Sequence, residues 1–297
     1  MNAPIKTAVF PVAGLGTRFL PVTKASPKEM LPIVDKPLIQ YAVEEAVRAG
    51  MTQMVFITGR NKRAIEDHFD KAFELETELE AKGRTALLET VRRMVPPSVS
   101  CIYVRQPEAL GLGHAVLCAR PVVGNEPFAV ILADDLIDAE PSTLQQMVDI
   151  YAERRNAVLA VQRIPAEDSS KYGVIRNEPI ADRLHRIAGM VEKPRPEDAP
   201  SDLAVVGRYI LTPRLFDFLE RIGKGTGGEI QLTDGIARLL DVEHVLALEF
   251  KGTRYDCGSK LGYLMANFVY AMRHEEVGVE FARFAAAQAR AVPGGGA

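Results

Sequence analysis

Short apolar runs alternate with stretches of helical periodicity over the first half of the chain. The runs typical of buried strands are 6–12, 53–58, 99–104, 128–133 and 157–161. Repeated strand–helix–strand units favour right-handed crossovers. We therefore predict an α/β fold: a Rossmann-like open sheet, mixed but mainly parallel, flanked by helices, with ligands bound beyond the carboxyl ends of its strands.

Two helical segments in this half carry further local signals. Asp35 is predicted to cap the first helix, with Pro37 in its first turn. Residues 61–94 are rich in Glu, Lys and Arg, which is typical of a helical stretch with a solvated face. Neither segment predicts chemistry by itself.

The second half is less regular. Its strand-like runs are 172–176, 185–192, 203–211 and 245–250, with helices near 213–222 and 229–240. We expect these elements to extend the same sheet. From Ser259 to about Arg290 the pattern is helical, with too many apolar residues for a solvated helix, so part of that surface is expected to pack on another subunit. The last residues, 293–297, are expected to be disordered.

Composition narrows the class of protein. The 297 residues are 47% hydrophobic and 25% charged, which suits an ordinary chain with a large core. A net charge of −3 provides no basic field, so no nucleic-acid partner is expected. Without a signal-like N-terminus or a membrane-length apolar run, we expect no membrane partner and a cytoplasmic location. Cys101, Cys118 and Cys257 form no C-x-x-C pair and are expected to be free thiols.

A glycine-rich loop follows the first predicted strand. Gly14 and Gly16 let the backbone bend tightly and bring its N–H groups close to a ligand. Thr17 adds a hydroxyl, and Arg18 adds a fork of donors suited to phosphate oxygens. Lys28 supplies a second cation ten residues later. Together these residues predict a cradle for a polyphosphate.

Two familiar glycine loops do not fit this segment. The dinucleotide fingerprint requires a third glycine where this chain has Phe19, and no Walker sequence is present. A Rossmann dehydrogenase is therefore disfavoured. Glycines at a strand end often serve only to turn the backbone. Arg18 and Lys28 are the residues that favour a phosphate-binding loop over a simple turn.

Carboxylates stand after two predicted strands. Asp134 and Asp135 directly follow the run 128–133, and Asp256 follows a later strand-like run. Magnesium bound with nucleotides needs only one or two protein carboxylates, because phosphate and water fill its other positions. The alternative is that these residues only shape turns. The phosphate loop predicted at the same sheet edge favours a metal role for Asp134.

The order of these motifs resembles a known family. Gly14-Leu-Gly-Thr-Arg18 followed by Pro27-Lys-Glu-Met-Leu-Pro32 is similar to the sugar-nucleotide pyrophosphorylases, above all to the bacterial uridylyltransferases that act on glucose 1-phosphate. Tyr255-Asp-Cys-Gly258 and Val191-Glu-Lys-Pro194 fit the same family, and the resemblance spans residues 5 to about 265.

The resemblance implies a domain organisation. It predicts the nucleotide-diphospho-sugar transferase fold, with a nucleotidyltransferase domain at 1–265. Within that domain the nucleotide-binding part is expected at about 1–140 and the sugar-binding part at about 141–258. A C-terminal helical extension and disordered tail are expected at 266–297.

The resemblance also implies roles for single residues. It places the nucleotide against Ala13, Gly14, Gly16, Thr17, Arg18, Lys28, Gln106 and Gly111. It implies that the sugar phosphate is bound by Asp135, Gly173, Glu192 and Lys193. Asp134 and Asp256 are the implied ligands of Mg²⁺. The residues expected to take part in catalysis are Arg18, Lys28, Asp134 and Lys193.

The implied reaction converts UTP and α-D-glucose 1-phosphate to UDP-glucose and pyrophosphate. The sugar phosphate would attack the α-phosphorus directly, with no covalent enzyme intermediate. Two alternatives stay open: a nucleotidyltransferase using dTTP or another hexose 1-phosphate, and a non-catalytic sugar-nucleotide-binding regulator of the same fold. The protein is expected to be a homo-oligomer, either a dimer or a tetramer.

Overall fold

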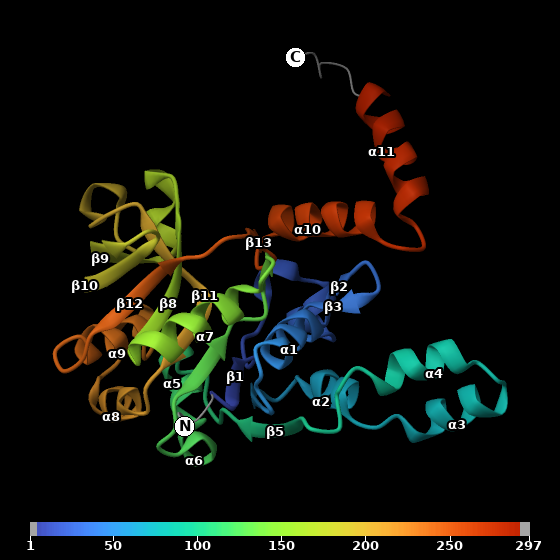
Figure 1. Cartoon of the computed structure of the whole chain (residues 1–297), viewed down its shortest axis with the longest axis horizontal. Helices are drawn as coiled ribbons and strands as arrows, with labels where there is room; N and C mark the ends of the chain where they lie inside the picture. The colour runs from blue at the N-terminus through green and yellow to red at the C-terminus, as the bar shows by residue number, and fades with distance from the viewer. Residues whose placement is uncertain (1–4, 292–297) are drawn as a thin grey trace.

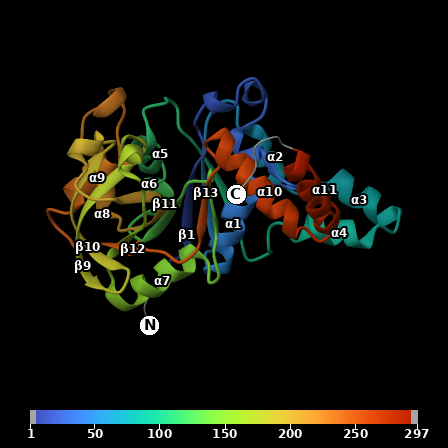
Figure 2. The ribbon, with the colours of Figure 1, turned by 90° about the horizontal axis from the view of Figure 1, so that it is seen from above.

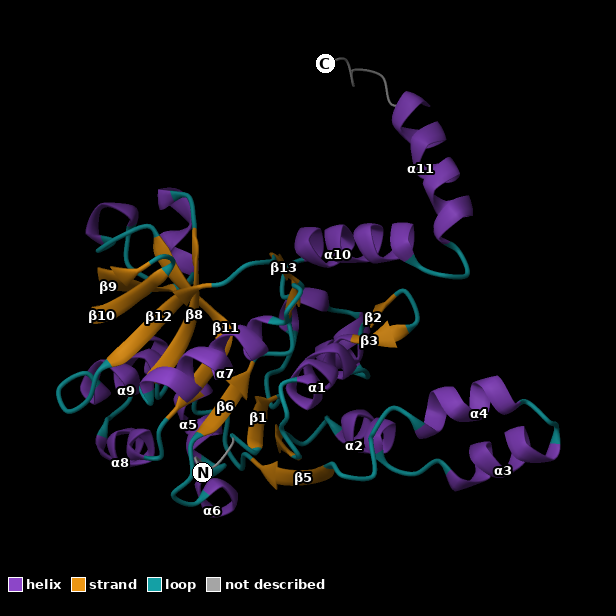
Figure 3. Ribbon diagram, viewed as in Figure 1, coloured by secondary structure: helices purple, strands orange, loops and turns teal. Residues whose placement is uncertain are grey.

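A nine-stranded mixed sheet runs through residues 5–291, the part of the chain that the computed structural model describes (Figures 1 and 3). Its strand order is β5-β4-β1-β6-β11-β8-β12-β10-β9. The first four strands are parallel. They are β1 (Thr7–Pro11), β4 (Gln53–Thr58), β5 (Ser100–Arg105) and β6 (Phe128–Ile131). Their carboxyl ends meet at one edge, which is where the predicted phosphate loop begins.

The second half of the chain extends this sheet with mostly antiparallel neighbours. Its strands are β8 (Ala157–Arg163), β9 (Gly173–Ala181), β10 (Leu184–Glu192), β11 (Leu203–Leu211) and β12 (Val245–Glu249). β11 is antiparallel to both β6 and β8, whereas β12 is parallel to β8. The expected Rossmann-like α/β class is confirmed, and the antiparallel pairings show where the sheet departs from a parallel one.

Helices cover both faces of the sheet, and the sheet separates two apolar cores. Along β1, Ala8 and Phe10 face one core while Val9 faces the other, as the alternation of a strand requires. The first core packs against α1 (Leu38–Arg48), α2 (Arg63–Phe69) and α7 (Thr143–Arg154). The second packs against α5 (Leu112–Leu117), α6 (Arg120–Val123), α8 (Arg214–Arg221) and α9 (Leu232–Leu239).

Two small ribbons and several single turns complete the body. β2 (Pro32–Ile33) pairs with β3 (Lys36–Pro37), and β7 (Asp135–Asp138) pairs with β13 (Thr253–Asp256). The 3₁₀ turns are η1 (Thr17–Phe19), η2 (Val22–Lys24), η3 (Lys28–Met30), η4 (Ala166–Lys171), η5 (Pro196–Asp198) and η6 (Thr226–Gly228).

The predicted cap of the first helix is wrong. Asp35 lies in the turn between β2 and β3, and α1 begins only at Leu38, with Pro37 at its N-cap position. Pairing of Ile33 with Lys36 closes a hairpin there, so the acidic residue shapes a turn and does not reach the helix.

Two helical arms extend from the body (Figures 1 and 2). The charged stretch 61–94 contains α2, then α3 (Phe73–Ala81) and α4 (Thr85–Arg92), which form a projecting hairpin. The second arm consists of α10 (Lys260–Arg273) and α11 (Gly278–Ala291). The predicted boundary at 265 falls inside α10, and the tail predicted at 293–297 lies outside the described residues. In the described part of the chain, no helix is long and apolar enough to cross a membrane.

Candidate active site

A cleft of about 710 Å³ lies beyond the carboxyl ends of β1 and β6, between the parallel strands of the first half of the chain and the strands of the second half. Side chains from both halves and from the start of α10 line it. The predicted site residues in this lining are Arg18, Asp134, Asp135, Gly173, Glu192, Lys193 and Asp256. Residues separated by more than 230 positions thus share one cavity.

Lys28 joins the cleft through an ion pair with Asp134. Lys28 Nζ lies 2.5 Å from Asp134 Oδ2, and both side chains are about three-quarters buried. Burial alone would lower the pKa of Lys28, but the Asp134 and Glu29 carboxylates together outweigh it and raise that pKa. Burial would likewise raise the pKa of Asp134, but the Lys28 ammonium holds it below its usual range. Both groups are therefore charged at neutral pH.

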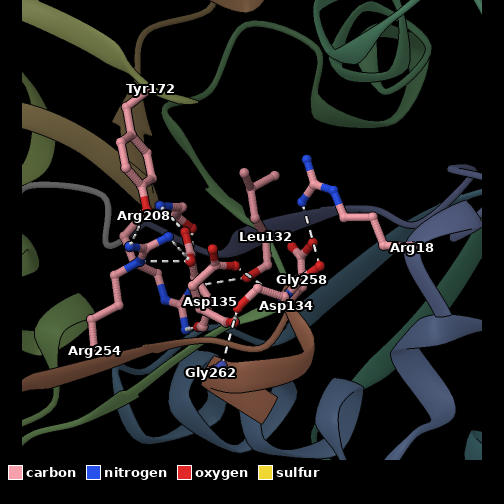
Figure 4. Close-up of polar contacts among 12 residues, drawn as sticks. Arg18, Leu132, Asp134, Asp135, Tyr172, Arg208, Arg254, Gly258 and Gly262 are labelled. Carbon is pink, nitrogen blue, oxygen red and sulfur yellow. Dashed lines mark hydrogen bonds and ion pairs between the residues drawn. The ribbon is translucent and has the colours of Figure 1, made fainter. Parts of the chain in front are cut away.

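Arg18, Asp134 and Asp256 surround a single glycine. A Cβ atom added to Gly258 would lie 3.0 Å from Asp134 Oδ2, 3.0 Å from Asp256 Oδ1 and 3.3 Å from Arg18 Nη1. The two carboxylate oxygens are therefore within about 6 Å of each other. Arg18 Nη1 donates to the Gly258 carbonyl at 3.4 Å, and Cys257 N donates to the Asp134 carbonyl at 2.8 Å (Figure 4). The first loop and the later strand tips thus face one cleft.

The two carboxylates fit a divalent cation. Burial raises the pKa of Asp256, and the nearby Asp135 and Asp134 carboxylates raise it further. A cation between Asp134 and Asp256 would relieve this repulsion. Among residues 5–291, no group of three or more His, Cys, Asp or Glu side chains is placed to hold a metal. Magnesium does not require one, since it accepts one or two carboxylates together with phosphate oxygens and water.

Asp135 is engaged by protein donors on both of its oxygens (Figure 4). Oδ2 accepts from Gly207 N at 2.7 Å, and Oδ1 accepts from Arg254 Nε at 2.6 Å. The Arg254 guanidinium also donates to the Tyr172 hydroxyl at 3.2 Å and lies 5.1 Å from the centre of its ring. Asp135 lines the cleft, and its contact with the sugar stays a prediction. Arg254 holds its carboxylate in position.

The predicted sugar side has a close-packed floor. A Cβ atom on Gly173 would meet Thr233 Cγ2 at 2.8 Å and Glu192 Oε2 at 3.3 Å, so only glycine fits between them. Lys193 Nζ lies 3.2 Å from Glu192 Oε1. The Lys193 backbone has a φ of +47°, which is uncommon for a residue with a side chain, and its N–H donates to the Tyr172 carbonyl at 2.9 Å. This strained turn aims the Glu–Lys pair at the cleft.

The remaining predicted nucleotide-binding residues lie at the same sheet edge, outside the lining of this cavity. Ala13, Gly14, Gly16 and Thr17 follow β1, and Gln106 and Gly111 follow β5. Gln106 Nε2 donates to the Gly111 carbonyl at 3.1 Å and lies 3.0 Å from His114 Nδ1. These contacts shape the loop that the base would approach. Direct contacts of this set with a nucleotide stay predictions.

Gly111 has a packing role as well. Its φ is +100°, and an added Cβ atom would lie 2.6 Å from Glu229 Cβ and 2.9 Å from the Ile230 carbonyl oxygen. The loop after β5 is therefore pressed against the segment that leads into α9, and only glycine fits there.

Comparison with known proteins identifies the family. Residues 8–272 match the family described as nucleotidyl transferase. The chain belongs to the nucleotidyl transferase family. A relative from Pseudomonas aeruginosa named UTP--glucose-1-phosphate uridylyltransferase is 53% identical over 269 residues, which cover 90% of this chain and 96% of the relative. A relative of the same name from Bacillus subtilis is 50% identical over 92% of this chain and 93% of its own length.

Solved structures of nucleotidyl transferases are also similar to this one. A UDP-glucose pyrophosphorylase complexed with UDP-glucose matches with a TM-score of 0.84 and 48% identity, covering 91% of this chain and 100% of the other. A UTP-bound UGPase from Acinetobacter baumannii matches with a TM-score of 0.87 and 45% identity, covering 95% and 99%. The resemblance inferred from the sequence motifs is confirmed at the level of family and fold.

Two residues of this nucleotidyl transferase cleft were not predicted from the sequence. Arg254 precedes Asp256 by two positions on β13, so strand alternation alone places both side chains on one face. Gly207 interrupts the apolar run of β11, and a glycine inside a strand marks a close approach of another group. A Cβ atom there would lie 2.6 Å from Asp135 Oδ2. Both features are visible in the sequence, but neither indicates that the residue contacts Asp135.

Proposed function

We propose that this nucleotidyl transferase converts UTP and α-D-glucose 1-phosphate to UDP-glucose and pyrophosphate. The observation that carries the proposal is the grouping of Arg18, Asp134 and Asp256 around Gly258, in a cleft that Lys193 also lines. The cations and carboxylates around Gly258 suit a metal-bound triphosphate, and Lys193 in the same cleft suits the phosphate of a sugar phosphate. The names of relatives about half identical to this chain support the same substrates.

The protein would act by alignment and by neutralising charge. Arg18 and Lys28 stabilise the triphosphate, and Lys193 holds the phosphate of glucose 1-phosphate so that its oxygen faces the α-phosphorus. A phosphate oxygen is already a nucleophile, so no general base is required. Mg²⁺ held by Asp134 and Asp256 would neutralise charge on the phosphate oxygens. Lys28 Nζ is paired with Asp134 Oδ2, so a metal held by this carboxylate would free Lys28 to bind the substrate phosphates.

We assign the remaining residues to the nucleotide or to the sugar. The loops after β1 and β5 would bind the nucleotide through Ala13, Gly14, Gly16, Thr17, Gln106 and Gly111. Glu192, Gly173 and Asp135 would contact the hexose. On this division, residues 1–140 are the nucleotide-binding part of a domain at 1–265, residues 141–258 are the sugar-binding part, and 266–297 form an extension. We place the enzyme in the cytoplasm as a homo-oligomer.

A pyrophosphate-release assay tests the proposal. Purified protein should release pyrophosphate from UTP only when glucose 1-phosphate and Mg²⁺ are both present. We expect kcat/KM for UTP to exceed that for dTTP. Likewise, kcat/KM for glucose 1-phosphate should exceed the values for galactose 1-phosphate and mannose 1-phosphate. Higher kcat/KM with dTTP or with another sugar phosphate would favour the alternative specificity. Binding of UDP-glucose without any pyrophosphate release would favour a non-catalytic regulator.

A further inference from the structure

One arginine lies buried next to the turn that carries Asp134. Arg208 belongs to β11, whose other residues are uncharged and are all buried. The Arg208 side chain is only 2% exposed. A charged group at that depth needs hydrogen-bond acceptors and a counter-charge. The reaction proposed above does not use Arg208, so its contacts must be explained in another way.

All five N–H groups of the Arg208 guanidinium have an acceptor. Nε and Nη2 donate to Glu45 Oε2 on α1, at 2.9 and 2.8 Å. Nη1 donates to the carbonyl oxygens of Leu132 and Gly207, at 3.0 Å each. The second N–H of Nη2 donates to the Asp135 carbonyl oxygen at 2.8 Å (Figure 4). Arg208 therefore joins the end of β6, the start of β7 and its own strand to a helix.

Glu45 fixes the guanidinium to the body of the protein. Its side chain is 5% exposed, and its second oxygen, Oε1, accepts from Leu144 N at 2.9 Å in the first turn of α7. Both α1 and α7 pack on the same apolar core. Glu45 also neutralises the charge of Arg208, so the guanidinium adds no net positive charge beside a site for Mg²⁺.

The carbonyl groups that Arg208 holds lie on both sides of Asp134. We call residues 132–135 the Asp134 turn. Leu132 precedes Asp134 by two positions and Asp135 follows it directly, and Asp135 N donates to the Leu132 carbonyl oxygen at 3.2 Å. Rotation of the backbone at Asp134 would break these contacts. The direction of the Asp134 carboxylate is therefore set from behind by Arg208.

Stability alone does not account for this buried pair. Apolar residues of similar volume often stabilise a core as well as a buried ion pair does. What they cannot supply is donors for buried carbonyl oxygens at the point where the pairing of a strand ends. The planar fork of an arginine reaches several acceptors in fixed directions, which a single ammonium group cannot do. Arg208 thus provides geometry at the Asp134 turn.

We propose that Arg208 is a positioning residue for the magnesium site. Its guanidinium, fixed by Glu45, holds the Asp134 turn so that the Asp134 carboxylate faces Asp256 beside Gly258. The inference rests on the proposed function in one respect: it takes Asp134 to be a ligand of Mg²⁺ bound with UTP. Loss of a contact that orients a metal ligand typically weakens metal binding by about 10–100-fold.

Two variants separate positioning from charge compensation. Arg208→Lys keeps a cation beside Glu45 but has three donors on one atom in place of the planar fork. The double variant Glu45→Met/Arg208→Met contains neither buried charge and tests the same turn if Arg208→Lys does not fold. Met54→Ala is the matched control: Met54 is completely buried near the amino end of β4, so its loss destabilises the core at the end of the sheet away from the cleft. Circular dichroism and urea denaturation check folding.

Binding of UTP is measured by titration calorimetry in Mg²⁺ and in EDTA, without glucose 1-phosphate and therefore without turnover. We expect Mg²⁺ to tighten UTP binding about tenfold or more in wild-type protein and in Met54→Ala. In Arg208→Lys and in the double variant the gain should be about twofold or less, with the affinity in EDTA unchanged. Hydrogen exchange of the ligand-free proteins should be about tenfold faster in peptides that cover the Asp134 turn of both Arg208 variants, and unchanged there in Met54→Ala.

A folded Arg208→Lys protein or double variant with the full gain from Mg²⁺ would overturn the inference. Unchanged hydrogen exchange at the Asp134 turn would overturn it as well, and equal effects in Met54→Ala would show that Arg208 contributes only stability. Wild-type protein whose UTP binding does not respond to Mg²⁺ would refute the proposed function, and hydrogen exchange would still decide whether Arg208 holds the turn.

Discussion

The ion pair between Asp135 and Arg254 can be removed one side at a time. Its side chains are 9% and 7% exposed, so each charge depends on the other for compensation. Asp135→Asn keeps the size of the side chain and leaves the Arg254 guanidinium buried without its counter-charge. Arg254→Met keeps a side chain of similar length but leaves the buried Asp135 carboxylate without its cation. The double variant contains neither buried charge.

The expected loss of stability follows from the burial of the pair. Breaking a buried ion pair by removing one partner costs about 3–5 kcal/mol, because the remaining charge is left in a low-dielectric site. We expect each single variant to lose about 3 kcal/mol of unfolding free energy. The double variant should lose about 2 kcal/mol less than the sum of the two single losses. The cation above the Tyr172 ring disappears in Arg254→Met, so Tyr172 should become less well positioned beside the cleft.

Urea denaturation and kinetics together provide the test. Both single variants should raise the KM for glucose 1-phosphate by about tenfold, corresponding to about 1.4 kcal/mol of lost binding, and the double variant should not multiply the two effects. The reasoning is refuted if Asp135→Asn raises that KM with unchanged stability while Arg254→Met behaves like wild type. Asp135 would then act on the sugar alone, without any positioning role through Arg254.

Four further predictions concern single groups. Arg18→Ala should slow pyrophosphate release by about a hundredfold or more, the loss expected for one electrostatic donor, and normal activity would remove Arg18 from the mechanism. Asp134→Asn should raise the Mg²⁺ concentration that gives half-maximal rate, and an unchanged titration would contradict its role as a ligand. Glu29→Gln should break the buried pair with Lys62, 2.7 Å long, and lower the free energy of unfolding measured in urea by about 3 kcal/mol; an unchanged free energy of unfolding would show that the pair is dispensable. Burial raises the pKa of Cys257 to about 12, so this thiol stays protonated at pH 8, and iodoacetamide should label it only after unfolding; rapid labelling of native protein would contradict its burial.

Local signals in the sequence were sufficient for the sheet and for one side of the site. Strand β6 was evident because four consecutive apolar residues, Phe128 to Ile131, are buried on both faces. Asp134 follows that strand and therefore had to emerge at the sheet edge. Glycines followed by Arg18 predicted a phosphate-binding loop, because such loops depend on local backbone geometry.

Features that depend on partners distant in sequence could not be predicted. The hairpin that displaces Asp35 from α1 depends on pairing between two-residue strands, which have no periodicity to detect. The partner of Asp135 is Arg254, which lies 119 residues away and comes close only through the β7–β13 ribbon. The antiparallel position of β11 between β6 and β8 likewise follows from chain connections and not from any local pattern.

The central claim is that Arg18 and Asp134 act on the same substrate phosphates across one cleft. A double-mutant cycle on kcat/KM for pyrophosphate release tests it most directly, with Arg18→Ala, Asp134→Asn and the double variant compared with wild type. Residues that act as a unit show losses far smaller together than the product of the single losses. We predict that the double variant is within about tenfold of the slower single variant. Losses that multiply in full would show two independent sites and contradict the account.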